Sequence, residues 1–155
     1  MGDAERELLE AAALLSNVGL FVSHSGHHKH SYYVIRNSEH LMGFTDREIE
    51  LIAQVARYHR KSQPSEDKHA EFAALAEADR HRVRSMAGVL RVAIGLDRNH
   101  DGAVDQVEVR VEDGRAVLRL VAVEDDGDLT LERYSADHRS SLLSQQLGCE
   151  VVVEA

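Results

Sequence analysis

The hydrophobic pattern of the chain changes in the stretch NHDGAVDQVEVRVEDGRAVLRLVAV, residues 99–123. Its apolar residues alternate with polar ones in two runs, 104–111 and 117–123, which are separated by Asp113-Gly114. Alternation is typical of half-buried strands, and an Asp-Gly pair between two such runs favours a tight turn. The stretch therefore predicts a β-hairpin.

Before the hairpin, the apolar residues recur at the three- to four-residue spacing that is typical of helices. Thr45-Asp46-Arg47-Glu48 also has the form of a capping box, in which the Thr45 hydroxyl and the Glu48 carboxylate each pair with an otherwise free amide. Helices are predicted over residues 4–18, 31–41, 45–59, 68–78 and 79–96.

The residues after the hairpin predict a strand over 129–134, a short helix over 136–147 and a last strand over 149–153. We therefore expect a mostly α fold class. A helical bundle over residues 1–100 is followed by a small α+β subdomain over residues 101–155.

The composition is that of an ordinary globular domain, with 155 residues of which 43% are hydrophobic and 29% are charged. The one cysteine, Cys149, cannot form an internal disulfide, and no apolar run is long enough to span a bilayer. The acidic start, MGDAERE, lacks the basic region of a secretory signal. We therefore expect a cytoplasmic protein that does not bind membranes.

The net charge of −9 is concentrated in the last third of the chain. Residues 1–100 hold 13 Lys and Arg against 14 Asp and Glu, whereas residues 101–155 hold 5 against 13. The nearly neutral first part also carries nine of the ten histidines. The overall acidity is thus no argument against a polyanion bound to the first part.

The densest group of chemically active residues is the histidine-rich run at residues 24–30, with His59-Arg60-Lys61 further along the chain. Neutral imidazoles are common ligands of zinc and other transition metals. The spacing does not match a closed zinc motif, however, and no cysteine lies nearby in the sequence. We therefore interpret this run as a solvated loop in preference to a structural metal site.

The same run favours anion binding. The loop at residues 25–26 leads into a predicted helix, and the free amides and dipole at a helix start attract anions. Lys29, Arg57, Arg60 and Lys61 could add full charges, and phosphate is the natural ligand. The last three cations could instead complement the carboxyl end of the third helix, and the two roles are compatible.

Other chemistry finds little support in the sequence. The arginines of the last predicted helix, residues 79–96, are interpreted as a solvated face. Neighbouring acids and an aromatic content of 5% argue against nucleic acid as a partner. No nucleophile elbow, P-loop or convincing pair of catalytic carboxylates is found.

Several stretches of the first hundred residues fit one common pattern, and the most specific is HSGHHKHSYY at residues 24–33. The others lie at residues 14–19, 36–39, 43–44, 56–61 and 90–98. Together they strongly resemble the exopolyphosphatase and guanosine pentaphosphate phosphatase (Ppx/GppA) family, specifically its C-terminal HD-like region. The resemblance covers residues 8–100, and the α+β part is in keeping with it.

The resemblance implies that hydrolysis takes place outside this chain. In the family, an N-terminal pair of actin-like, ATPase-fold domains binds phosphates and activates water with a carboxylate and Mg²⁺. We therefore expect an accessory C-terminal domain of an exopolyphosphatase, with no cofactor of its own. The implied partners are polyphosphate, the catalytic actin-like domains and a second copy in a homodimer.

The departures from active HD domains concern the metal ligands. Active HD-domain phosphohydrolases carry a His-Asp pair where this chain has Ser16-Asn17, and a later Asp where the resemblance places Ile94. These side chains cannot replace the imidazole and carboxylate ligands of a hard metal. The departures therefore argue against an independent metal-dependent enzyme. The alternative hypotheses are an HD-type metal-dependent phosphohydrolase that uses the histidine cluster in place of the lost ligands, and a purely structural dimerisation module.

The leading hypothesis is a domain that binds polyphosphate and supports assembly of the enzyme that releases orthophosphate from the chain ends. A polyphosphate strand presents repeating charge, so a row of cations and amide donors is enough to hold it. Its path is predicted to be lined or bordered by His27, His28, Lys29, His30, Arg57, His59, Arg60 and Lys61. The preference between polyphosphate and guanosine pentaphosphate stays open.

Overall fold

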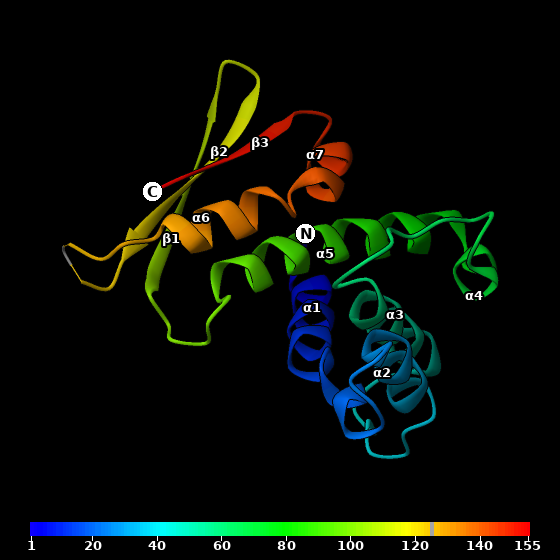
Figure 1. Ribbon diagram of the computed structural model, residues 1–155. Helices are drawn as coiled ribbons and strands as arrows, with labels where there is room; N and C mark the ends of the chain where they lie inside the picture. The colour runs from blue at the N-terminus through cyan, green and yellow to red at the C-terminus, as the bar shows by residue number, and fades with distance from the viewer. Residues whose placement is uncertain (125) are drawn as a thin grey trace. The chain divides into compact units, whose positions relative to one another are not determined.

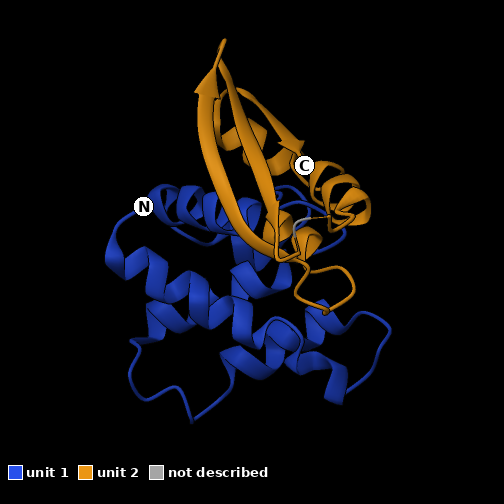
Figure 2. Cartoon of the chain, turned by 90° about the vertical axis from the view of Figure 1, so that its left-hand side faces the viewer, with its two compact units in different colours: residues 1–90 blue, residues 91–155 orange. Residues whose placement is uncertain are grey.

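Helices build the first part of the chain, and a sheet with short helices builds the last part (Figure 1). The computed structural model describes residues 1–124 and 126–155, which form two compact units, Met1–Leu90 and Arg91–Ala155 (Figure 2). This order confirms the predicted fold class. The units divide inside the longest helix, whereas the predicted boundary at residue 100 marks the change in sequence period.

The helical unit is organised around one buried helix. Its elements are α1 (Asp3–Leu15), the 3₁₀ turn η1 (Val18–Phe21), α2 (His27–Arg36), α3 (Asp46–Arg57), α4 (Ala70–Ala73) and the first turns of α5 (Glu77–Leu96). Every residue of α3 from Leu51 to Ala56 is buried, and α1 and α2 both pack against this helix. The position of α2 on α3 matters most for the candidate site.

Two of the predicted helices begin or end elsewhere. Helix α2 begins at His27 rather than Ser31 and ends at Arg36, because Gly26 turns the chain at φ 71° and the first two histidine rings fit the interior. The predicted helix over 4–18 stops at Leu15, where Ser16 donates its hydroxyl hydrogen to the carbonyl of Ala13 at 2.9 Å.

The helix predicted over 68–78 is also shorter than expected, because only α4, Ala70–Ala73, forms there. The guanidinium of Arg80 donates to the carbonyls of Ala73 and Leu75, at 3.2 and 2.7 Å. These bonds satisfy carbonyls at the end of α4, so the chain can leave the helix and restart as α5 at Glu77.

The capping box at the start of α3 is confirmed. The amide of Glu48 donates to Oγ1 of Thr45 at 3.3 Å, and the amide of Thr45 donates to Oε2 of Glu48 at 2.7 Å. These bonds satisfy two amides that a helix start leaves free.

The α+β unit contains a sheet of three strands in the order β1 (Val104–Glu112), β2 (Arg115–Ala122) and β3 (Glu150–Glu154). Strands β1 and β2 form the predicted hairpin, and Asp113 and Gly114 both have positive φ, as a tight two-residue turn requires. Strand β3 joins β2 in parallel. The core of this unit is aliphatic and includes Leu118, Leu120 and Val153.

The strand predicted over 129–134 is wrong, because this segment forms helix α6 (Thr130–Asp137). The alternation of Leu129 and Leu131 resembles a strand, but the buried residues are Leu129, Glu132, Ser135 and Ala136, at helical spacing. The helix predicted over 136–147 is likewise interrupted, and α7 (Ser141–Leu147) forms its second half. Among the described residues, no helix is long and apolar enough to cross a membrane.

Candidate functional site

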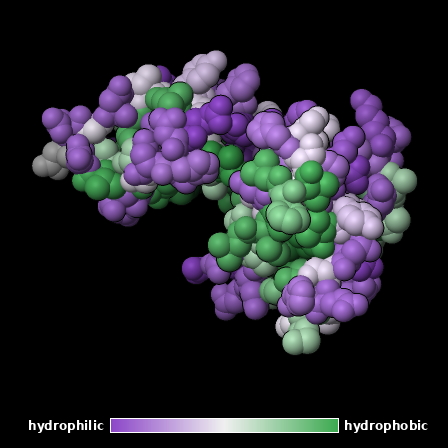
Figure 3. All heavy atoms as spheres, turned by 60° about the horizontal axis from the view of Figure 1, so that its bottom comes forward, coloured by the Kyte–Doolittle hydropathy of each residue, from purple (hydrophilic) through white to green (hydrophobic). Residues whose placement is uncertain are grey.

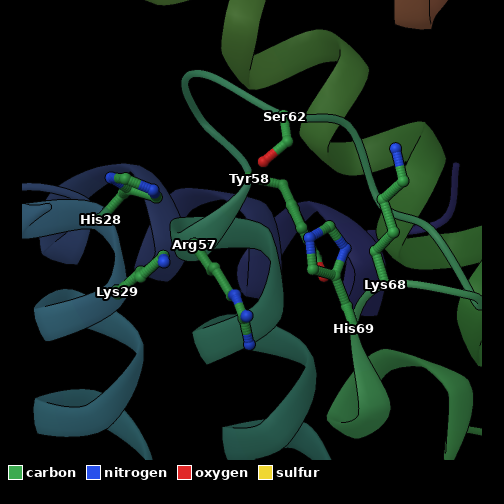
Figure 4. A pocket seen from close by; sticks show the side chains of 7 residues that line it. All are labelled: His28, Lys29, Arg57, Tyr58, Ser62, Lys68 and His69. Carbon is green, nitrogen blue, oxygen red and sulfur yellow. The ribbon is translucent and has the colours of Figure 1, made fainter.

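A cavity of about 210 Å³ opens on the helical unit between the start of α2, the end of α3 and the chain that leads into α4. Figure 4 shows His28 and Lys29 entering it from α2, Arg57 from α3 and His69 from the far side. The complete lining is His28, Lys29, Arg57, Tyr58, Ser62, Lys68 and His69. The cavity is therefore lined almost entirely by cationic and hydrogen-bonding side chains.

The start of α2 is held in place by a glycine and a buried serine. Ser31 donates its hydroxyl hydrogen to the carbonyl of Ser16 at 2.7 Å and accepts from the amide of Gly19 at 2.9 Å. A Cβ atom on Gly19 would lie 2.2 Å from the carbonyl oxygen of His27. Only glycine allows this approach, which fixes the helix turn that carries His28 and Lys29.

Arg57 is the most firmly positioned of the cations in the cavity. Its guanidinium lies over the rings of Tyr32 and Tyr58, 5.3 and 5.6 Å from their centroids, and pairs with Glu71 at 3.2 Å. Lys29 and Lys68 are exposed at the sides of the cavity. Arg57 is thus preorganised, whereas the two lysines are free to adapt to a ligand.

The two histidines of the cavity are held neutral. His28 is only 6% exposed, and burial, aided by His59, Lys61 and Arg60, lowers its pKa from 6.5 to about 4. Its Nδ1 atom is buried and makes no hydrogen bond within the described part of the chain.

Burial also lowers the pKa of His69, and the charge of Arg57 adds to this effect. The Nδ1 atom of His69 accepts a hydrogen bond from the amide of Ser65 at 3.1 Å. Since a neutral imidazole has one donor nitrogen and one acceptor nitrogen, the ring proton of His69 lies on Nε2. His69 therefore keeps one N–H group beside the cationic side chains.

A chain of hydrogen bonds between His59, His27 and Arg60 lies beside the cavity. Nδ1 of His59 donates to the carbonyl of Ala56 at 2.6 Å, so its Nε2 accepts from Nε2 of His27 at 3.3 Å. With this tautomer, Nδ1 of His27 accepts from the guanidinium of Arg60 at 3.4 Å. The carbonyl of His24 lies 3.2 Å from the same Nδ1 atom, and it pairs with the ring only in the tautomer that carries the proton on Nδ1. Burial and the charge of Arg60 keep the pKa of His27 below its usual value.

The structure brings three of the eight predicted site residues together in the cavity, namely His28, Lys29 and Arg57. His27, His59 and Arg60 form the neighbouring hydrogen-bond chain, in which both histidines are buried. The lining formed by the described residues does not include His30 or Lys61.

Sequence reasoning missed the opposite wall of the cavity, which Lys68 and His69 form. These residues were assigned to the predicted helix over 68–78 and were not considered as ligands. The adjacent Lys-His pair, which follows the break at Pro64, was the signal that could have identified them.

Ser16, which the resemblance places at a metal-ligand position of active HD domains, is used for packing here. Ser16 is buried, and its hydroxyl caps the end of α1 through Ala13. Within residues 1–124 and 126–155, no group of three or more His, Cys, Asp or Glu side chains is arranged to hold a metal ion.

Comparison with known proteins gives matches over most of the chain. The family described as Ppx/GppA phosphatase, domain III, matches residues 1–144. A guanosine-5'-triphosphate,3'-diphosphate pyrophosphatase from Pseudoalteromonas translucida (strain TAC 125) is 31% identical over 107 residues, which cover 68% of this chain and 20% of that relative. The chain thus spans about a fifth of that relative's length. On these matches, the chain belongs to the Ppx/GppA phosphatase family and corresponds to its domain III.

Proposed function

We propose that this chain is an accessory domain that binds a phosphate chain, polyphosphate in the first place, in the cavity between α2, α3 and α4. The observation that carries the proposal is the convergence of Lys29, Arg57 and Lys68 on one cavity that also holds two neutral histidines. The family match supports an accessory role, because it assigns the chain to domain III of a phosphatase.

The chemistry of the cavity suits phosphate oxygens. A guanidinium can donate two parallel hydrogen bonds to one phosphate, and the lysine ammonium groups act as mobile point charges. Nε2 of His69 adds a neutral donor, and the unpaired Nδ1 of His28 gains a partner if the ring takes up a proton. A bound anion favours that protonation, so binding is coupled to proton uptake by the histidines.

The decisive experiment measures the affinity of the chain for long-chain polyphosphate by calorimetry at low and high salt. Replacing both exposed lysines, Lys29→Ala and Lys68→Ala, is expected to weaken binding by about tenfold to a hundredfold. It is also expected to reduce the salt dependence, since fewer counterions are released.

The matched control is Arg6→Ala, which removes one exposed cation from α1 and none from the cavity. Equal losses in the control and in the lysine variant would contradict the cavity as the binding site. Absence of binding at low salt would contradict the proposal as a whole. Competition by a guanosine pentaphosphate would show that both phosphate chains use the same site.

A second role, in assembly of the parent enzyme, is supported by hydrophobic side chains that gather on the surface of the helical unit (Figure 3). Leu14, Phe21 and Met42 are all at least 87% exposed. We propose that such side chains dock the catalytic domains. Phe21→Ser is expected to weaken co-elution of the chain with those domains, and unchanged co-elution would contradict this role.

A further inference from the structure

Arg57, the preorganised cation of the cavity, already holds a carboxylate. Its Nη1 atom donates a hydrogen bond to Oε2 of Glu71 at 3.2 Å. Glu71 lies in α4, two residues after His69, which lines the cavity. A phosphate bound in the cavity and this carboxylate therefore compete for the same guanidinium.

The two side chains of this ion pair differ in how firmly they are held. The side chain of Arg57 is 14% exposed and lies over the rings of Tyr32 and Tyr58. The hydroxyl of Tyr32 in turn donates to Glu50 at 3.1 Å. Glu71 is 51% exposed, and its helix has only four residues. The arginine therefore keeps its place without Glu71, whereas the carboxylate can turn into the solvent.

A phosphate chain is the stronger partner for this guanidinium. Arginine can donate two parallel hydrogen bonds to one phosphate, and a half-exposed ion pair such as that of Glu71 contributes little free energy. A single phosphate on Arg57 exchanges one ion pair for another. A chain also reaches Lys29 and Lys68 on the walls of the cavity, so it gains ion pairs in the exchange.

We propose that the phosphate chain takes the place of Glu71 on Arg57, so that Glu71 is an internal competitor that regulates the affinity of the cavity. This inference rests on the proposed function, because it requires a phosphate chain in the cavity. The competitor weakens the binding of every anion that uses Arg57. Only a ligand with further phosphate groups offsets this loss through the two lysines, so the exchange favours chains over single phosphates.

Calorimetry with long-chain polyphosphate compares two carboxylate variants of the intact chain. Glu71→Gln keeps the shape of the side chain and removes its charge, so it is expected to bind polyphosphate about threefold to tenfold more tightly than the wild type. Glu66→Gln is the matched control, because Glu66 is similarly exposed but pairs with Arg80 and Arg84, which are absent from the cavity lining formed by the described residues. The control is expected to change the affinity by less than about twofold.

An NMR titration of the glutamate carboxyl groups separates the exchange from a general effect of charge. In the free chain, a hydrogen bond from its own backbone amide lowers the pKa of Glu71, burial opposes this effect, and Arg57 lowers the pKa further. In the complex, the carboxylate loses Arg57 and gains a negatively charged neighbour, so its pKa is expected to rise. The pKa of Glu66, which the hydrogen bond from Arg84 lowers, is expected to stay nearly unchanged.

The outcomes distinguish this inference from the proposed function. A wild type that does not bind polyphosphate overturns both. A wild type that binds, beside a folded Glu71→Gln variant of equal or weaker affinity, overturns the exchange alone, because Glu71 then holds Arg57 in place or plays no part. Equal gains in Glu71→Gln and Glu66→Gln, or a pKa of Glu71 that polyphosphate leaves unchanged in the wild type, overturn the exchange as well. Far-UV circular dichroism verifies that each variant is folded.

Discussion

The two units of this protein differ in what they bury. The helical unit buries His27, His28 and His59 around α3, and hydrogen bonds or a lowered pKa accommodate each of them. The core of the α+β unit is a cluster of aliphatic side chains, and the polar residues buried beside it are Glu132, Ser135 and Ser140 rather than histidines. Buried polar groups are costly unless they are satisfied, so their concentration beside one cavity supports the proposal that the helical unit carries the binding site.

The largest expected effect is the destabilisation of one unit, but not of the other, by a substitution at a closely packed glycine. A Cβ atom on Gly19 would lie 2.2 Å from the backbone of α2, and one on Gly95 would lie 2.6 Å from the backbone of α6. Gly19→Ala is expected to lower the free energy of unfolding of the helical unit by about 3 kcal/mol, through displacement of backbone. Gly95→Ala has the corresponding effect on the α+β unit.

Hydrogen exchange read by mass spectrometry locates each effect. Gly19→Ala should remove protection from His27–Arg36, and Gly95→Ala should remove it from Thr130–Asp137. The same pattern of lost protection in both variants would contradict the division into two separately organised units.

The buried histidine of the cavity makes stability depend on pH. The pKa of His28 falls from 6.5 to about 4 on folding, so the unfolded chain takes up the proton first as pH decreases. The free energy of unfolding is therefore expected to fall by about 1–2 kcal/mol between pH 6.5 and 5 from this residue alone. Urea unfolding at both pH values measures it.

His28→Gln is the control, because it removes this titration and should reduce the fall in stability. His27 and His69, whose pKa values are also lowered, account for part of what remains. An identical pH dependence in the wild type and His28→Gln would show that His28 does not titrate as proposed.

The smallest expected effect concerns the hairpin turn of the α+β unit. Gly114 has φ 74° in the hairpin turn, and an alanine in this region costs about 1 kcal/mol. Gly114→Ala should lower the thermal midpoint, whereas Asp113→Gly should leave it unchanged or raise it, since Asp113 has φ 50°. Equal effects of the two changes would contradict this turn geometry.

Sequence reasoning succeeded where one short pattern determines local structure. The hairpin at Asp113-Gly114 and the capping box at Thr45 were predicted correctly, because each depends on neighbouring residues only. The segment 129–134 was assigned to a strand because Leu129 and Leu131 alternate with polar residues, yet Leu131 is exposed in the structure. The close approach of Ala136 to Gly95, which is far away in the sequence, could not be predicted from that local pattern.

Only the part of the candidate site that lies in one short run of sequence was predicted. His28 and Lys29 were found because they are close together in a distinctive run. Lys68 and His69 come from a separate segment, and only the tertiary fold brings them to the same cavity. The burial of His27 and His59 could not be predicted either, since it depends on the position of α2 against α3.

The most direct test of the central claim is a titration of the histidine resonances by NMR, with and without saturating polyphosphate. The account predicts that the pKa values of His28 and His69 rise in the complex, because both rings lie in the cavity with the bound anion. His100 and His138, in the α+β unit, serve as internal references. Unchanged pKa values at His28 and His69, or equal shifts at all four histidines, would contradict the cavity as the phosphate site.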